Sequence, residues 1–121
     1  MAKREPTPAG KLLVVDDDLP FRRSLAISLR LDGIEVLEAG NRAEALAALG
    51  LGGVGLALVN QHLDADGGEA LMEEIARLSP STRIAAVSYQ PGLRSTAVSS
   101  GRAQQLVKPI SLDAVRKLLA G

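Results

Sequence analysis

Short, mainly apolar runs alternate with amphipathic stretches along most of the chain. The runs predict five buried strands, at 12–15, 34–37, 56–59, 84–87 and 105–107. In the stretches that follow each run, apolar residues recur every three or four positions, which predicts five helices. Strands that alternate with helices in this way predict one parallel sheet covered on both faces, a doubly wound α/β fold.

Stripes of spaced apolar residues, and the polar residues before them, give the approximate helix positions. Asp18 is predicted to cap a helix that Gly33 ends, and Asn41 to cap a helix that runs through Leu49. The helix predicted at 93–99 has the weakest pattern. The other stripes are Phe21, Leu25 and Leu29, then Leu71, Ile75 and Leu78, and finally Leu112, Val115 and Leu119.

Length and composition narrow the possible classes of protein. A chain of 121 residues suits one domain, expected at 11–121 after a loose leader at 1–10. Fourteen basic and fourteen acidic residues cancel, and only Phe21 and Tyr89 are available to stack on bases, so no nucleic-acid partner is expected. The chain has no cysteine, which excludes disulfides and thiolate metal sites and favours the cytoplasm.

Candidate site residues follow four of the five predicted strands. Asp16 and Asp17 follow the first, Asn60 the third, Ser88 the fourth and Lys108 the fifth. The carboxyl ends of parallel strands share one edge of the sheet, so these side chains are expected to converge on a single polar pocket. Such a pocket contains oxygen ligands suited to Mg²⁺ and an ammonium suited to a phosphoryl oxygen.

With these residues in place, the sequence resembles the response-regulator receiver domain of two-component signalling, in the CheY-like superfamily. The resemblance runs from Lys11 to the C-terminus and rests on the VVDDD stretch, the strand that ends in Ser88 and the VKP tripeptide. The DDDLPF opening and the HLDADGG loop resemble most the receivers of redox-responsive global regulators. The resemblance implies a flavodoxin-like (βα)5 fold.

The same resemblance implies a phosphorelay signalling module, not an enzyme, with a protein partner. That partner would be a histidine kinase, an output domain or a second copy bound through residues 93–119, and no membrane is implied. Asp16 and Asp17 would hold Mg²⁺ with the backbone carbonyl of His62. Ser88 would sense the phosphoryl group and Lys108 would neutralise it.

The sequence departs from the family pattern at the centre of the pocket. Asn60 stands where the family carries its phospho-accepting Asp, and a neutral amide is not a carboxylate nucleophile. One negative charge fewer also predicts that Mg²⁺ binds only weakly. Gln105 replaces the usual switch Tyr or Phe, Tyr89 stands where a small residue is usual, and Asp64 where many members have Pro.

Three hypotheses follow. The leading one is an atypical receiver, a pseudo-receiver that acts by phosphorylation-independent protein–protein contact. The second is an ordinary phospho-accepting receiver, the N-terminal part of a transcriptional regulator, that carries a blocking Asp-to-Asn substitution at Asn60. The third, a flavodoxin-like cofactor binder, is disfavoured because aromatic residues are scarce and no phosphate loop follows the first strand.

Several features have simpler interpretations. Gly50, Gly52 and Gly55 spell G-x-G-x-x-G, but the motif binds dinucleotides only between a strand and a following helix, and here the predicted order is reversed. His62 is the single histidine and is interpreted as a solvated loop residue.

The remaining polar candidates also have structural interpretations. Ser88 is expected to bond to the loop backbone, and Lys108 either to form an ion pair with the carboxylates or to serve the site. A solvated helix face is expected for Arg22, Arg23 and Arg30.

Overall fold

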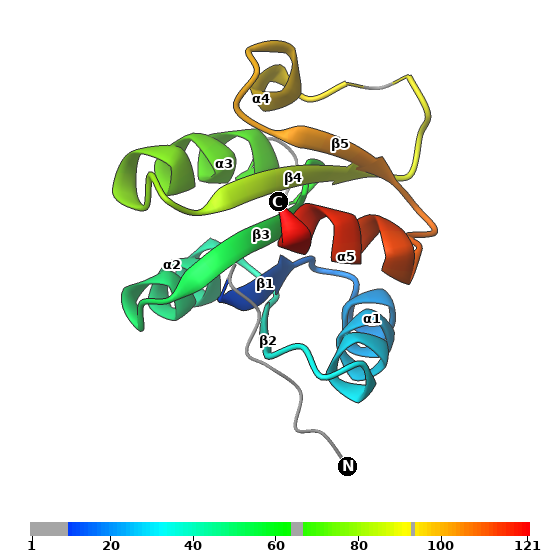
Figure 1. Cartoon of the computed structure of the whole chain (residues 1–121). Coiled ribbons are helices and arrows are strands. Elements are labelled where there is room, and N and C mark those ends of the chain that lie inside the picture. The colour runs from blue at the N-terminus through cyan, green and yellow to red at the C-terminus, as the bar shows by residue number, and fades with distance from the viewer. Residues whose placement is uncertain (1–9, 64–66, 93) are drawn as a thin grey trace.

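Five parallel strands form one sheet in the computed structural model, which describes residues 10–63, 67–92 and 94–121 (Figure 1). Their order across the sheet is β2-β1-β3-β4-β5. The strands are β1 (Lys11–Val15), β2 (Val36–Ala39), β3 (Val54–Asn60), β4 (Arg83–Ser88) and β5 (Gln104–Val107). The predicted doubly wound parallel sheet is confirmed.

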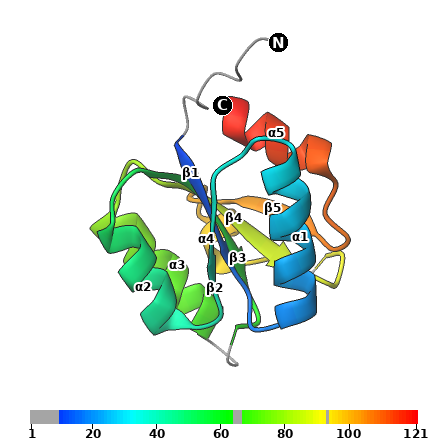
Figure 2. The same ribbon diagram turned by 90° about the horizontal axis from the view of Figure 1, so that it is seen from below.

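Helices cover both faces of the sheet, with α2 (Arg42–Gly50) and α3 (Gly67–Leu78) on one side and α1 (Leu19–Leu31) and α5 (Leu112–Ala120) on the other (Figure 2). Both predicted caps are confirmed: Asp18 accepts a hydrogen bond from the Phe21 amide, and Asn41 accepts one from the Glu44 amide. No helix in the described ranges is long and apolar enough to cross a membrane. The helices are α1 (Leu19–Leu31), α2 (Arg42–Gly50), α3 (Gly67–Leu78), α4 (Thr96–Ser99) and α5 (Leu112–Ala120).

The central strands are buried on both faces because successive side chains point to opposite sides. In β1, Leu12 and Val14 pack towards α1 and α5, whereas Leu13 and Val15 pack towards α2 and α3. This explains why the strands appear in the sequence as unbroken apolar runs, and it holds the polar ends of β1 and β3 next to each other.

The second strand lies two residues later than predicted. Ile34 is buried, but its amide closes the end of α1 by donating to the Leu29 carbonyl, so its backbone does not join the ladder. Pairing with β1 begins at Val36 and continues through Glu38 to Ala39. Glu38 is polar, so the apolar pattern alone did not indicate that the strand continued through it.

Two predictions about helices need correction. The fourth helix is the single turn Thr96–Ser99, which begins after the N-cap Ser95 and not at residue 93. Leu78, predicted to be part of the buried stripe of α3, is 61% exposed, and Met72 is buried together with Leu71 and Ile75. The predicted leader, except Gly10, the departure at Asp64 and the first residue of the predicted fourth helix, 93, lie outside the described residues.

Candidate functional site

The ends of β1 and β3 bring Asn60 against Asp16 and Asp17. The amide nitrogen of Asn60 donates to Oδ1 of Asp16 and to Oδ1 of Asp17, each over 3.3 Å. Its carbonyl oxygen accepts from the His62 amide at 3.0 Å. Carboxylates only accept hydrogen bonds and a backbone amide only donates. With its nitrogen towards the two carboxylates and its oxygen towards the His62 amide, the Asn60 side chain therefore forms a hydrogen bond with each of the three.

Asp16 is the most deeply buried charge of the pocket, with its side chain 2% exposed. Its Oδ1 also accepts from the Asp18 amide at 2.9 Å. Its Oδ2 has no hydrogen-bond partner and depends on the Lys108 ammonium, which lies 3.0 Å away as an ion pair. Lys108 also lies over the Phe21 ring, 3.9 Å from its centroid, a cation–π contact that fixes its approach.

In this arrangement the residues present fit a divalent cation poorly. The carboxylates of Asp16 and Asp17 are suitable oxygen ligands and would hold the cation, but in this structure the Asn60 nitrogen donates to both of them. Turning its oxygen inward would break the bond to the His62 amide. No group of three or more His, Cys, Asp or Glu side chains suited to a metal occurs among residues 10–63, 67–92 and 94–121.

Ser88, at the end of β4, is connected to the pocket through His62. The Ser88 hydroxyl donates to the Gln90 carbonyl and accepts from the Gln90 amide. These are the hydrogen bonds to the loop backbone that were predicted for Ser88. The hydroxyl also lies 3.3 Å from Nε2 of His62. His62 is half-buried in the turn after β3, and its ring contacts the exposed Tyr89 ring at a centroid distance of 5.0 Å, so the prediction of a solvated loop residue is correct for its place in a turn and only partly correct for its exposure.

Gln105 makes the polar contacts of the predicted switch position. Its Nε2 donates to Oε1 of Gln61 at 2.9 Å and to the Ala86 carbonyl at 3.3 Å. Its Oε1 accepts from the Ser95 amide at the start of α4, over 3.2 Å. One side chain therefore joins the loop after β3, the strand β4 and the N-terminus of α4.

Glu69 of α3 holds the same end of α4. Its Oε1 accepts from the Ser95 hydroxyl at 3.0 Å and from the Thr96 amide at 3.2 Å. Carboxylates stabilise helix N-termini because the first amides there have no partner within the helix. A helix of one turn is thus anchored from two directions, by Glu69 and by Gln105.

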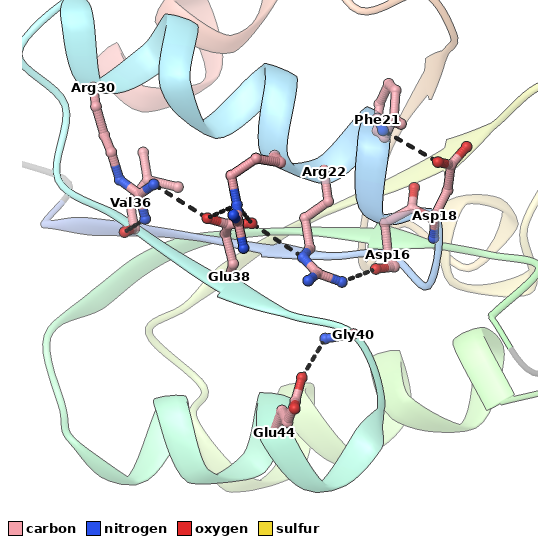
Figure 3. A network of polar contacts seen from close by, with 10 residues as sticks. Asp16, Asp18, Phe21, Arg22, Arg30, Val36, Glu38, Gly40 and Glu44 are labelled. Atoms are coloured by element: carbon pink, nitrogen blue, oxygen red, sulfur yellow. Dashed lines mark hydrogen bonds and ion pairs between the residues drawn. The ribbon is translucent and has the colours of Figure 1, made fainter.

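The arginines of α1 form a network around Glu38 of β2, which Figure 3 shows. Arg22, Arg23 and Arg30 all donate to its carboxylate, at 3.0–3.1 Å. Burial raises the pKa of Glu38, but hydrogen bonds from Arg23, Arg22 and Arg30 together outweigh it and the pKa is lowered below 4.5. The predicted solvated face is therefore wrong for Arg22, whose side chain is 14% exposed.

Arg22 also connects this network to the pocket. Its Nη1 donates to the Asp16 carbonyl at 2.8 Å, next to the acidic pair (Figure 3). No sequence signal identified this role, because Arg22 and Glu38 belong to a helix and a strand sixteen positions apart.

Gly68 is a second residue that the sequence interpretation missed. A Cβ atom at this position would overlap the Asn60 carbonyl and the Gln61 backbone, so only glycine allows α3 to begin against the end of β3. The glycine pair in the HLDADGG loop was the available signal. The G-x-G-x-x-G match, by contrast, runs from Gly50 at the end of α2 to Gly55 inside β3, so a helix precedes it and a strand follows, as predicted, which is the wrong order for a dinucleotide site.

The comparisons with known proteins show the fold and the family of the chain. The family model described as the response regulator receiver domain matches residues 12–120. A CheY-like receiver domain protein from Methanospirillum hungatei is 26% identical, with a TM-score of 0.79 over 91% of this chain and 93% of that one. The comparison with curated proteins finds no match.

Two further structures are similar to this chain. A response regulator from Burkholderia pseudomallei, solved with a phosphorylated aspartic acid, a calcium ion and citrate, is 29% identical, with a TM-score of 0.80 over 91% of this chain and 66% of that one. Thermotoga maritima TrrA, in complex with Mg²⁺-BeF, shares the fold at 24% identity, with a TM-score of 0.77 over 91% of this chain and 96% of that one. The chain therefore belongs to the response regulator receiver domain family of two-component signalling proteins.

Proposed function

We propose that this chain is an atypical cytoplasmic receiver domain that works through protein–protein contact without being phosphorylated. The observation that carries the proposal is the position of the Asn60 amide, which donates to both Asp16 and Asp17. Phosphoryl transfer to the end of β3 needs an oxygen nucleophile that carries charge. An amide oxygen is neutral and is a much weaker nucleophile than a carboxylate oxygen.

The electrostatics of the pocket support the same proposal. The Asn60 amide donates a hydrogen bond to Oδ1 of Asp16, and the Lys108 ammonium forms an ion pair with Oδ2. Groups of the chain itself therefore balance the negative charge of Asp16. Mg²⁺ would have to displace these existing contacts. It would also find one carboxylate ligand fewer than in a pocket with Asp at position 60. Binding of Mg²⁺ is therefore proposed to be possible but weak.

The contacts of Gln105 support a partner-binding surface whose conformation does not depend on phosphorylation. Residues 94–119 include α4, β5 and most of α5, and Gln105 and Glu69 hold the start of α4 in place by direct hydrogen bonds. We place the partner-binding surface there. The partner is a histidine kinase, an output domain or a second copy of the chain.

A titration with Mg²⁺ and beryllofluoride tests the proposal, because beryllofluoride imitates a phosphoryl group bound to a carboxylate. The chain and its Asn60→Asp variant would be compared by the amide spectra of residues near the pocket. We expect saturable binding of beryllofluoride in the variant and no binding of beryllofluoride in the unaltered chain. Equally tight binding in both proteins would refute the proposal.

The second candidate is an ordinary receiver, the N-terminal part of a transcriptional regulator, in which Asn60 is a blocking substitution. It is favoured by the convergence of Asp16, Asp17 and Lys108, which a purely structural pocket does not need. The Asn60→Asp variant separates the two candidates. If phosphorylation of this variant rearranges α4 and β5, the ordinary receiver is favoured. If the variant keeps the surface formed by residues 94–119 unchanged, the atypical receiver is favoured.

A further inference from the structure

A cavity lies at the edge of the sheet opposite the acidic pocket. It has a volume of about 270 Å³ and is formed by the amino ends of β4 and β5 and by the last turn of α5. Its apolar wall consists of Leu56, Ile84, Ala103 and Leu118. This volume is near the lower end of small-molecule pockets, so it suits a single small body and not a dinucleotide.

The charged side chains that line this cavity are all basic. They are Arg83 at the start of β4, Arg102 in the connection before β5, and Lys117 in α5. No acidic side chain lines it, and the one negative group among its lining residues is the terminal carboxylate of Gly121. Like charges around one space repel each other, and an anion between them would be attracted by all three.

One of these cations is fixed and the other two are available. Nη2 of Arg83 donates to the Leu119 carbonyl at 3.0 Å, which orients its guanidinium at the cavity wall. Within the described part of the chain, the side chains of Arg102 and Lys117 have no hydrogen bond or ion pair. The carbonyl end of α5 accounts for a cation at Arg83 and for one at Lys117, but not for Arg102 in the neighbouring loop.

An adjoining hollow limits where the positive charge extends. It shares Arg102 with the cavity and is otherwise lined by Glu73, Ala76 and Arg77. The second hollow has two basic side chains and Glu73, whereas the cavity has three basic side chains and the Gly121 carboxylate, so the larger excess of positive charge lies on the side of Arg83 and Lys117. That side also has the apolar wall.

We propose that this cavity binds a small phosphate monoester with an apolar body, the phosphate held by Arg83, Arg102 and Lys117 and the body packed against Leu56, Ile84 and Leu118. Arginine suits this ligand because its guanidinium bonds phosphate through two parallel N–H groups, and lysine adds a point charge. The site lies beyond the proposed signalling function and uses none of the residues of the acidic pocket.

The proposal is tested by titrating the chain with phenyl phosphate and following the backbone amide signals of Gly101, Arg102, Ala103 and Gln104. Two further probes test the two parts of the ligand separately: inorganic phosphate carries the charge without the ring, and benzyl alcohol carries the ring without the charge. We expect saturable shifts with phenyl phosphate at concentrations up to about 10 mM, and weaker binding of both partial probes.

Exposed charges can be removed with little risk to folding, so the double variant Arg102→Gln/Lys117→Gln is the main test. The matched control, Lys11→Gln/Arg94→Gln, removes the same net charge elsewhere. We expect the affinity for phenyl phosphate to fall by about tenfold or more in the first variant and to change little in the control. Equal losses in the two variants, equal binding of inorganic phosphate, or no saturable shift in the unaltered chain would each overturn the proposal.

Discussion

The amide nitrogen of Asn60 lies 3.3 Å from Oδ1 of Asp16, a hydrogen bond that joins the ends of two neighbouring strands inside the pocket. An aspartate at this position would replace a donor by a third negative charge. Like charges at this separation repel, and the repulsion is stronger where burial lowers the local dielectric.

The Asn60→Asp variant should therefore depend on Mg²⁺ for its stability. We expect it to be less stable than the unaltered chain by about 1–3 kcal/mol in EDTA and to recover much of this in millimolar Mg²⁺. The unaltered chain should unfold at nearly the same temperature in both buffers. Calorimetry in the two buffers checks this, and Asn41→Asp, a cap position away from the pocket, is the control for added charge.

Replacing Lys108 by Met should destabilise the fold, because it leaves the buried Oδ2 of Asp16 without its ion-pair partner. The expected cost is about 3 kcal/mol, measured by urea unfolding. Lys108→Arg keeps the charge and should cost less. In the double variant Asp16→Asn/Lys108→Met the loss should be smaller than the sum of the two single losses, and simple additivity would contradict a direct pairing.

Gln105→Ala should loosen the start of α4. It removes the bonds to Gln61 and to the Ser95 amide, and we expect a loss of about 1–2 kcal/mol. Hydrogen exchange should become faster at the Ser95 and Thr96 amides while α1 keeps its protection. The neighbouring exposed residue provides the control, Gln104→Ala. Unchanged exchange at Ser95 would show that Glu69 alone holds the helix.

The network around Glu38 predicts a pH dependence of stability. The pKa of Glu38 is lowered in the folded chain, so its ionised form stabilises the fold above the ordinary value of 4.5, and this stabilisation is lost as the pH falls through the lower folded value. Glu38→Gln should cost about 1.5–3 kcal/mol near neutral pH, the range for hydrogen bonds to charged groups. The difference between the two proteins should shrink below pH 4.5. A difference that stays constant down to acid unfolding would exclude this assignment.

The sequence predicted the fold well because each central strand is buried on both faces, so β1, β3 and β4 appear as continuous apolar runs. It placed β2 wrongly because Ile34 is apolar but belongs to the turn, while Glu38 is polar but belongs to the strand. A pattern of hydrophobicity cannot show that three arginines neutralise that glutamate.

The site was predictable only as a set of positions. Parallel strands share one carboxyl edge, so Asp16, Asn60 and Lys108 could be expected near one another. How they bond could not, because the direction of the Asn60 amide depends on the His62 amide and on two carboxylates forty-three and forty-four positions away. The place of Gly68 depends on a backbone approach that leaves no mark on periodicity.

Incubation with acetyl phosphate and Mg²⁺, followed by intact-mass measurement, tests the central claim most directly. The mass of the untreated chain checks that Asn60 has not been converted to Asp, and the Asn60→Asp variant is treated in parallel as the positive control. We predict that the variant gains the mass of one phosphoryl group and the unaltered chain gains nothing. A phosphoryl group on Asn60 of the unaltered chain would contradict the account.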